Sequence, residues 1–268
     1  MKKRPIIIAA AVAVLSVSVL LVSRNTVAYL MDTEAADNVI QIGNVSVELK
    51  EESFPKDLQT IEVGKIIPKN PQLKNNGTND EYVFLKVSVP KENVTLLYES
   101  TVTDGGTTHH EGEKINNEAS YTEIFKVIAN GTQNSVVTEN SPPTIVVGYN
   151  NGNNNTNGWI YLKKETGTNA GDPDSYYFGY NRKLKVGETT SVPLFDQVQL
   201  KSFIDGEVAG NKDNQNTVIK DKQETVQVTA YAIQADDLGI TGVTGAENEY
   251  LDATALGKIW TVVNNKQG

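Results

Sequence analysis

The segment EYVFLKVSV at residues 81–89 alternates its side chains at a period of two. One face carries Val83, Leu85, Val87 and Val89, and the other carries Tyr82, Phe84, Lys86 and Ser88. This alternation predicts a β-strand, because successive side chains of a strand point to opposite faces. The following Pro90 ends the strand, since proline has no N–H to donate to a ladder.

The same pattern recurs along most of the chain. Further strands are predicted at 44–49, 60–67, 94–98, 144–149, 158–163, 176–180, 183–186 and 225–233. Turn sequences rich in Asn, Gly, Asp and Pro separate these strands. Many short strands joined in this way predict an all-β fold with minor helices, built as an antiparallel β-sandwich. Residues 44–268 show no internal boundary and are predicted to form one sandwich domain with long loops.

Three segments favour helices to different degrees. Residues 117–131 place apolar side chains at helical spacing and end at a glycine, and residues 191–204 fit either a short helix or the start of a strand. Residues 249–263 carry a helical apolar stripe that includes Trp260, so this C-terminal helix is expected to pack on the sandwich. The Asn-rich segment 150–158 is interpreted as a flexible hairpin tip.

The N-terminus has the features of a secretory signal peptide. A positive segment is followed by an uncharged apolar run from Pro5 to Val22, and small residues end at Ala28. Cleavage before Tyr29 is therefore predicted. The alternative is an uncleaved anchor helix, because a run of this length is close to the thickness of a bilayer.

Composition excludes several classes of protein. The formal net charge is −9, and loss of the basic leader makes it more negative, so the chain is not expected to bind nucleic acid or, once cleaved, a membrane. Cysteine is absent, which rules out thiol chemistry and disulfides. The absence suits a protein exported by a Gram-positive bacterium.

The sequence offers no convincing catalytic or metal site. The two histidines, His109 and His110, are neighbours in a Gly- and Thr-rich loop, where adjacent side chains of an extended chain diverge. HEGEK at residues 110–114 lacks the second histidine of a helical zinc-protease motif. Carboxylate pairs such as Asp172 and Asp174 lack the spacing of a calcium loop. We therefore expect no enzyme, no cofactor and no metal, and two exposed loop histidines.

Three stretches carry a resemblance to a known family. They are TVAYLMDTEAADNVIQIGNVSVELKEE at 26–52, GKIIPKNPQLKNNGTNDEYVFLKVSV at 64–89 and ETVQVTAYAIQADDLG at 224–239. Together with the signal peptide they resemble the TasA/CalY/camelysin family, whose members are processed by a SipW-type signal peptidase. The run from Arg24 to Val27 departs from the small, Gly-rich residues that the family has before the cut, and residues 98–158 match no part of the pattern.

The resemblance implies a jelly-roll-like sandwich that is secreted to the extracellular matrix or cell surface and assembles into biofilm matrix fibres. In such fibres each subunit donates its N-terminal segment to a neighbour, and an accessory matrix or anchoring protein is a further expected partner. Residues 29–43 are the candidate donor segment. Its assembly residues would be Tyr29, Leu30, Met31, Val39, Ile40 and Ile42.

Other interpretations stay open on the sequence. The stretch before Val45 fits the domain's own first strand as well as a donated one. A camelysin-like cell-surface metallopeptidase and a monomeric surface adhesin with long binding loops are the alternative functions.

Overall fold

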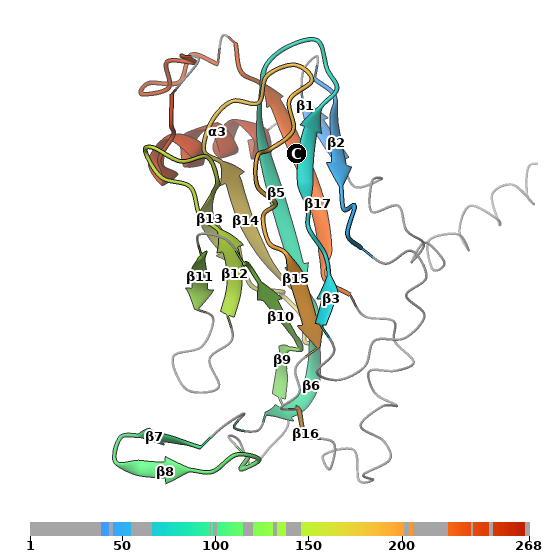
Figure 1. The fold of residues 1–268 in the computed structure, drawn as a ribbon, viewed down its shortest axis with the longest axis vertical. Coiled ribbons are helices and arrows are strands. Elements are labelled where there is room, and N and C mark those ends of the chain that lie inside the picture. The colour runs from blue at the N-terminus through green and yellow to red at the C-terminus, as the bar shows by residue number, and fades with distance from the viewer. Residues whose placement is uncertain are drawn as a thin grey trace, which may run out of the picture. The chain divides into compact units, whose positions relative to one another are not determined.

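In the residues that it describes, the computed structural model shows an all-β fold with one helix (Figure 1). It describes residues 39–42, 45–54, 66–96, 98, 101–114, 120–130, 133–137, 146–200, 204–205, 225–236, 238–246 and 249–265. The predicted signal peptide and its cleavage site at Ala28 and Tyr29 lie outside these residues. No helix within the described part is long and apolar enough to cross a membrane.

Two five-stranded sheets form the body of the domain. The first has the order β1 (Val39–Ile42), β17 (Gln227–Gln234), β5 (Glu81–Val89), β14 (Asp174–Tyr180) and β13 (Trp159–Glu165). The second has the order β11 (Gln133–Val137), β12 (Val146–Asn150), β10 (Phe125–Ile128), β15 (Gln197–Leu200) and β3 (Ile66–Pro68).

Smaller sheets extend this body. They are β16 (Ile204–Asp205), β6 (Lys91–Leu96) and β9 (Ser120–Glu123); β2 (Val47–Lys50) with β4 (Gln72–Asn75); and the hairpin of β7 (Val102–Asp104) and β8 (Thr107–His109). The helix α3 spans Ala253–Asn265.

The chain passes repeatedly from one large sheet to the other. Along the sequence the first sheet receives β1, β5, the pair β13–β14 and β17, and between them the second sheet receives β3, the group β10–β12 and β15, which is a jelly-roll-like order. Most of the ladders between described strands are antiparallel, as predicted. The exceptions are parallel pairs of β1 with β17 and of β10 with β12.

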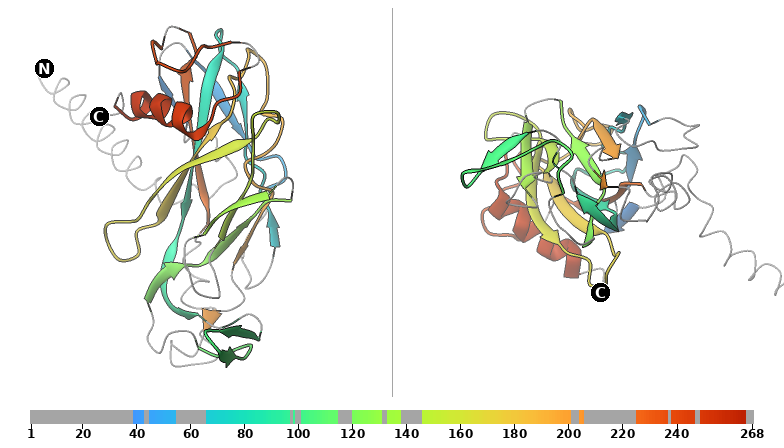
Figure 2. Two further views of the ribbon diagram at one scale, coloured as in Figure 1. Left: turned by 90° about the vertical axis from the view of Figure 1, so that its left-hand side faces the viewer. Right: turned by 90° about the horizontal axis from the view of Figure 1, so that it is seen from below.

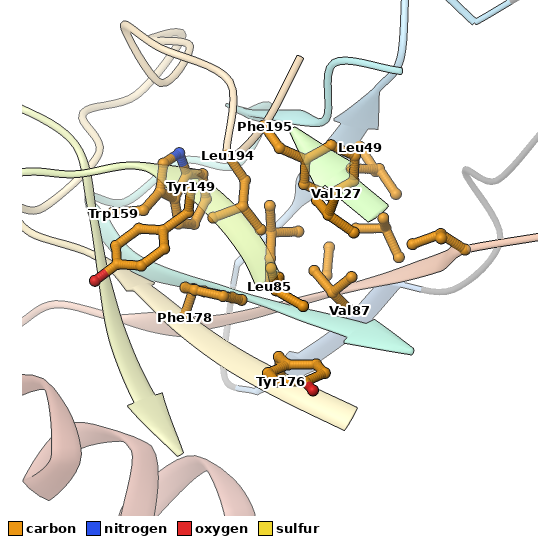
Figure 3. Close-up of a cluster of buried hydrophobic side chains, with 14 of the residues drawn as sticks. Leu49, Leu85, Val87, Val127, Tyr149, Trp159, Tyr176, Phe178, Leu194 and Phe195 are labelled. Atoms are coloured by element: carbon orange, nitrogen blue, oxygen red, sulfur yellow. The ribbon is translucent and has the colours of Figure 1, made fainter. Parts of the chain in front are cut away.

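The central strands explain why the sheets pack face to face. Alternate residues of β5, β14 and β17 point into one core, where Leu85, Val87 and Phe178 meet Val127 and Phe195 from the opposite side (Figure 3). All five side chains are at most 3% exposed. The alternation seen in the sequence of residues 81–89 is therefore confirmed as one buried face of β5.

The opposite face of the same strands is covered by α3. The helix packs against β13, β14 and β17 and runs across the strands rather than along them (Figure 2). Trp260 is the centre of this contact, with ring centroids 5.4 Å from Phe84, 5.0 Å from Tyr177 and 5.1 Å from Tyr231. Asp252 caps the helix by accepting a 2.8 Å hydrogen bond from the backbone N–H of Ala255. The predicted C-terminal helix and its buried tryptophan are confirmed.

The helix predicted at residues 117–131 is wrong over its described part. Residues 120–123 form β9 and residues 125–128 form β10. The apolar residues of this segment are mostly aromatic or β-branched. The helical stripe rested on Ala119, Ile124, Val127 and Ile128, whereas the buried Phe125, Val127 and Ala129 follow the period of two of a strand. The antiparallel ladder of β10 with β15 stabilises the strand conformation of residues 125–128. Residues 197–200 also form a strand, β15.

The Asn-rich segment folds as an organised turn. The side chain of Asn153 accepts hydrogen bonds from the backbone N–H groups of Asn155 and Thr156 at 2.8 and 3.0 Å. The fully buried Asn181 donates to the carbonyls of Asn153 and Thr156 and accepts from the N–H of Gly158. One side chain from the end of β14 thus fixes the backbone of this turn.

Replacement of Trp260 by alanine is expected to lower the free energy of unfolding by about 3–5 kcal/mol, because it opens a cavity between the helix and the sheet. Urea unfolding followed by circular dichroism measures the change. Thr261→Ala, on the exposed side of the same helix turn, is the matched control and should stay within about 0.5 kcal/mol of the parent chain. Equal effects of the two substitutions would contradict the helix–sheet packing.

Candidate functional site

The outer edge of β17 is paired over only half of its length. All eight residues of β17 pair with β5, from Gln227 opposite Ser88 to Gln234 opposite Glu81. On its other side only Ala230 to Ile233 pair, in parallel, with the four residues of β1. β17 would therefore keep its place without β1, but four residues of its edge would lose their ladder partners.

The side chains of β17 serve both layers of the fold. Val228, Ala230 and Ala232 are buried in the core between the sheets, and Tyr231 and Ile233 are buried beneath α3. The acceptor edge for β1 is thus backbone on a rigid, apolar strand. A strand added here gains its ladder hydrogen bonds against a surface that is already formed.

The residues after β1 are firmly anchored. Val45, Val47 and Leu49 are buried in the core between the sheets, and β2 pairs with β4 from Val47 opposite Asn75 to Lys50 opposite Gln72. The change from a four-residue edge strand to a buried strand falls between residues 42 and 45.

The structure places only part of the predicted assembly residues. Val39, Ile40 and Ile42 lie in β1, paired with β17 of the same chain. Tyr29, Leu30 and Met31 lie outside the described residues. Sequence analysis identified the segment but not its partner, since the register of a parallel edge strand leaves no mark in either strand alone.

The histidines lie at the hairpin of β7 and β8. The ring of His109 stacks on Tyr98 with centroids 4.5 Å apart, and its Nδ1 lies 3.4 Å from Oε1 of Glu113. The backbone N–H of His110 donates to the other Glu113 oxygen at 2.9 Å. Hydrogen bonds from His110 and His109 lower the pKa of the exposed Glu113 carboxyl. His110 is exposed as expected, while His109 is partly covered by the stack.

A cluster of two buried carboxylates and two partly buried lysines lies where β5 passes into β6. Asp174 at the start of β14 receives Nζ of Lys91 at 2.7 Å on Oδ1 and Nζ of Lys164 at 2.6 Å on Oδ2. Lys164 also lies 3.4 Å from Oε1 of Glu123, which accepts a hydrogen bond from the hydroxyl of Tyr176. The two carboxylates are 6% and 3% exposed. We call Lys91, Glu123, Lys164 and Asp174 the charge cluster.

Lys164 and Asp174 stabilise each other's charged form. Burial raises the pKa of Asp174, but hydrogen bonds from Lys164, Lys91 and the N–H of Gly167 outweigh it and hold that pKa below its usual value. Burial likewise lowers the pKa of Lys164, and its contacts with Asp174 and Glu123 more than reverse the effect. The contacts of the pair therefore outweigh the cost of burying it.

Sequence analysis missed the charge cluster. Its members come from four strands far apart in the sequence, and only Asp174 was noticed, as one half of a carboxylate pair. The other half, Asp172, is a turn residue that binds the backbone N–H of Asn169 at 2.8 Å. No local pattern distinguishes a strand lysine that turns inward from one that faces water.

Comparison with known proteins places the chain in a family. The model of the family described as camelysin metallo-endopeptidase matches residues 1–140, more than half of the 268 residues. The chain belongs to this family. No curated protein and no solved structure matches it.

A metallopeptidase needs a metal site. Within the residues that the structure describes, no group of three or more His, Cys, Asp or Glu side chains is placed to hold a metal ion. His109, His110 and Glu113 bring one ring nitrogen and one carboxylate together, with the second histidine contributing its backbone. The described part of this camelysin-family chain thus offers an incomplete ligand set at the hairpin.

One further buried acid is isolated from any charge cluster. Glu81, at the start of β5, is fully buried, and neither of its carboxyl oxygens has a hydrogen-bond partner among the described residues. Burial raises the pKa of Glu81 from 4.5 to about 8. The folded chain therefore holds this proton at neutral pH, where the unfolded chain has released it.

Glu81 predicts that the domain loses stability as the pH rises. Below about pH 4.5 the carboxyl is protonated in both states, and above about pH 8 it is ionised in both. Between these values only the unfolded state releases the proton. The contribution of Glu81 to the free energy of unfolding therefore falls by about 1.4 kcal/mol per pH unit. Urea unfolding at a series of pH values should show this slope in the parent chain and its loss in Glu81→Gln.

The exposed Glu52 supplies the matched control for Glu81. Glu52→Gln should leave the slope between pH 4.5 and 8 unchanged. A parent slope that survives Glu81→Gln would show that other groups cause it.

Proposed function

We propose that this camelysin-family chain is a secreted structural subunit of extracellular biofilm matrix fibres. It would polymerise by passing its N-terminal segment, residues 29–42, to the β17 edge of a neighbouring subunit. The parallel ladder of β1 on β17 is the observation that carries the proposal. In the fibre the same four pairs would form between subunits instead of within one.

Replacing β1 of the same subunit by β1 of a neighbour changes the free energy of the β17 ladder little. The pairs lost within one subunit, from Val39–Ala230 to Ile42–Ile233, are regained with the neighbour, so the balance depends on contacts made by the rest of the segment. β17 stays in place because β5 and both cores hold it. After β1 has left, the unpaired backbone groups at the edge of β17 can form a ladder with a segment of another chain.

The anchored β2 limits what can leave the domain. Val47 and Leu49 are buried, so the released part ends near residues 43–44, which agrees with the predicted boundary between donor segment and sandwich. Each subunit then has one donated segment and one acceptor edge at different places. Head-to-tail association of this kind does not close on itself and produces a filament.

The remaining parts of the proposal follow from the leader and the family. The signal peptide predicts export and cleavage between Ala28 and Tyr29 by a SipW-type signal peptidase. The mature chain would then act outside the cell, bound to further copies of itself and to an accessory matrix or anchoring protein.

The test compares protein that begins at Tyr29 with protein that begins at Gly43. Negative-stain electron microscopy should show regular filaments only from the longer chain, because the shorter one has an acceptor edge and no donor segment. A synthetic peptide of residues 35–44 should bind the shorter chain with 1:1 stoichiometry and should stop filament growth of the longer one.

A peptide with proline at both Ile40 and Gln41 is the matched control. Consecutive prolines remove the backbone N–H in whichever of the two positions faces β17, so this peptide should neither bind nor block growth. Filaments from both chains would show that assembly uses another surface. Dispersed monomers from both would favour the surface adhesin.

The family description makes a peptidase the second candidate. The fibre proposal expects that the purified chain cleaves an unfolded protein substrate no faster in the presence of Zn²⁺ than in the presence of a chelator. Cleavage that requires Zn²⁺ and is lost in His109→Ala with His110→Ala would instead support a metal-dependent peptidase. His109→Ala alone reports whether the stack on Tyr98 matters separately.

A further inference from the structure

The charge cluster brings the partly exposed amine of Lys164 into contact with two buried carboxyl groups. Nζ of Lys164 lies 2.6 Å from Oδ2 of Asp174 and 3.4 Å from Oε1 of Glu123. Lys164 and Asp174 belong to neighbouring antiparallel strands, where Lys164 is opposite Tyr176. The pair is therefore held together by the β13–β14 ladder rather than by its own attraction alone.

We propose that Lys164 and Asp174 form an intramolecular isopeptide bond, with Glu123 as the group that moves the proton. This covalent modification is independent of the proposed assembly. It would make the charge cluster a self-processing site within a single chain.

The two oxygens of Asp174 are arranged unequally, as amide formation requires. Oδ1 receives the ammonium of Lys91 at 2.7 Å and the backbone N–H of Gly167 at 3.1 Å. These donors stabilise the negative charge that develops on Oδ1 when the amine adds to the carboxyl carbon. Oδ2 faces Lys164 and is the oxygen that leaves.

The step balances without any co-reactant. Glu123 accepts a proton from the ammonium of Lys164, and the free amine attacks Cγ of Asp174. The Cγ–Oδ2 bond then breaks, and Oδ2 leaves as water. Of the three ammonium protons, one stays on the amide nitrogen and two depart in the water, so a carboxylate and an ammonium become a neutral amide with no change in oxidation state.

Two features of the fold promote amide formation. The fold holds the amine and the carboxyl in contact, which replaces a bimolecular encounter by an internal step. Burial penalises the separated charges of the ion pair but not the neutral amide. Asp174 is 6% exposed on its side chain, so water has little access for the reverse reaction.

The intact mass of the purified full chain tests the proposal directly. It should be lower than the sequence mass, corrected for any cleaved leader, by one water molecule. Proteolysis followed by tandem mass spectrometry should give a branched peptide that joins Lys164 to Asp174. The branched peptide is required, because succinimide formation at an aspartate also releases water.

Three variants separate the roles. Lys164→Arg keeps the charge but lacks a nucleophilic amine, so it should show the full sequence mass. Glu123→Gln should accumulate the uncondensed chain. Asp174→Asn, if it folds, should lose one ammonia in place of one water. Lys163→Arg, next in sequence and paired with Glu165 at 2.5 Å on the surface, is the matched control and should retain the loss of water.

Several results would overturn the proposal. Full sequence mass in the folded parent chain would show that the pair remains ionic. A branched peptide that joins Lys91 to Asp174 would show that Lys91, and not Lys164, is the nucleophile. An unchanged loss of water in Lys164→Arg would place the dehydration elsewhere.

Discussion

Burial of the β17–β5–β14 strands on both faces is the constraint on which the rest of the structure depends. One face packs into the core between the sheets, and the other lies beneath α3. A sheet with two covered faces needs apolar residues at consecutive positions, which β5 and β14 supply. Gly179 of β14 shows how closely the layers approach, since a Cβ there would lie 3.0 Å from Phe84 and 3.1 Å from Leu256. The second sheet, the helix and the acceptor edge all take their positions from these three strands.

The same burial determines how the molecule treats charge. In the charge cluster, hydrogen bonds from Lys164 and Lys91 hold the carboxyl of Asp174 in its ionised form. Where a carboxyl is alone, as at Glu81, the protein keeps its proton instead. A net-negative chain thus holds its buried acids by two different means, and the two respond differently to pH. Only the isolated acid makes neutral solution less favourable than acidic solution for the fold.

The sequence predicted the fold where one physical signal dominated. The period of two at residues 81–89 and the helical stripe around Trp260 were both sufficient, because in each segment the apolar residues follow one period clearly. The signal was ambiguous at residues 120–128, where Ile124, Val127 and Ile128 have helical spacing and Phe125 and Val127 have strand spacing; the observed pairing with β15 is that of a strand. Asn181 could not be foreseen as the residue that organises the Asn-rich turn, since its partners lie more than twenty residues away. The charge cluster was hidden for the same reason, and so was the β1 register on β17.

The parallel orientation of β1 has a mechanical consequence. Because the two strands point the same way, a load applied between the chain before Val39 and the chain after Gln234 pulls them past each other along their axes. Such a load shears all the bonds of the ladder together instead of opening them one after another from an end. A short strand held in this geometry resists tension better than its length suggests, while it can still be peeled away by a force applied sideways.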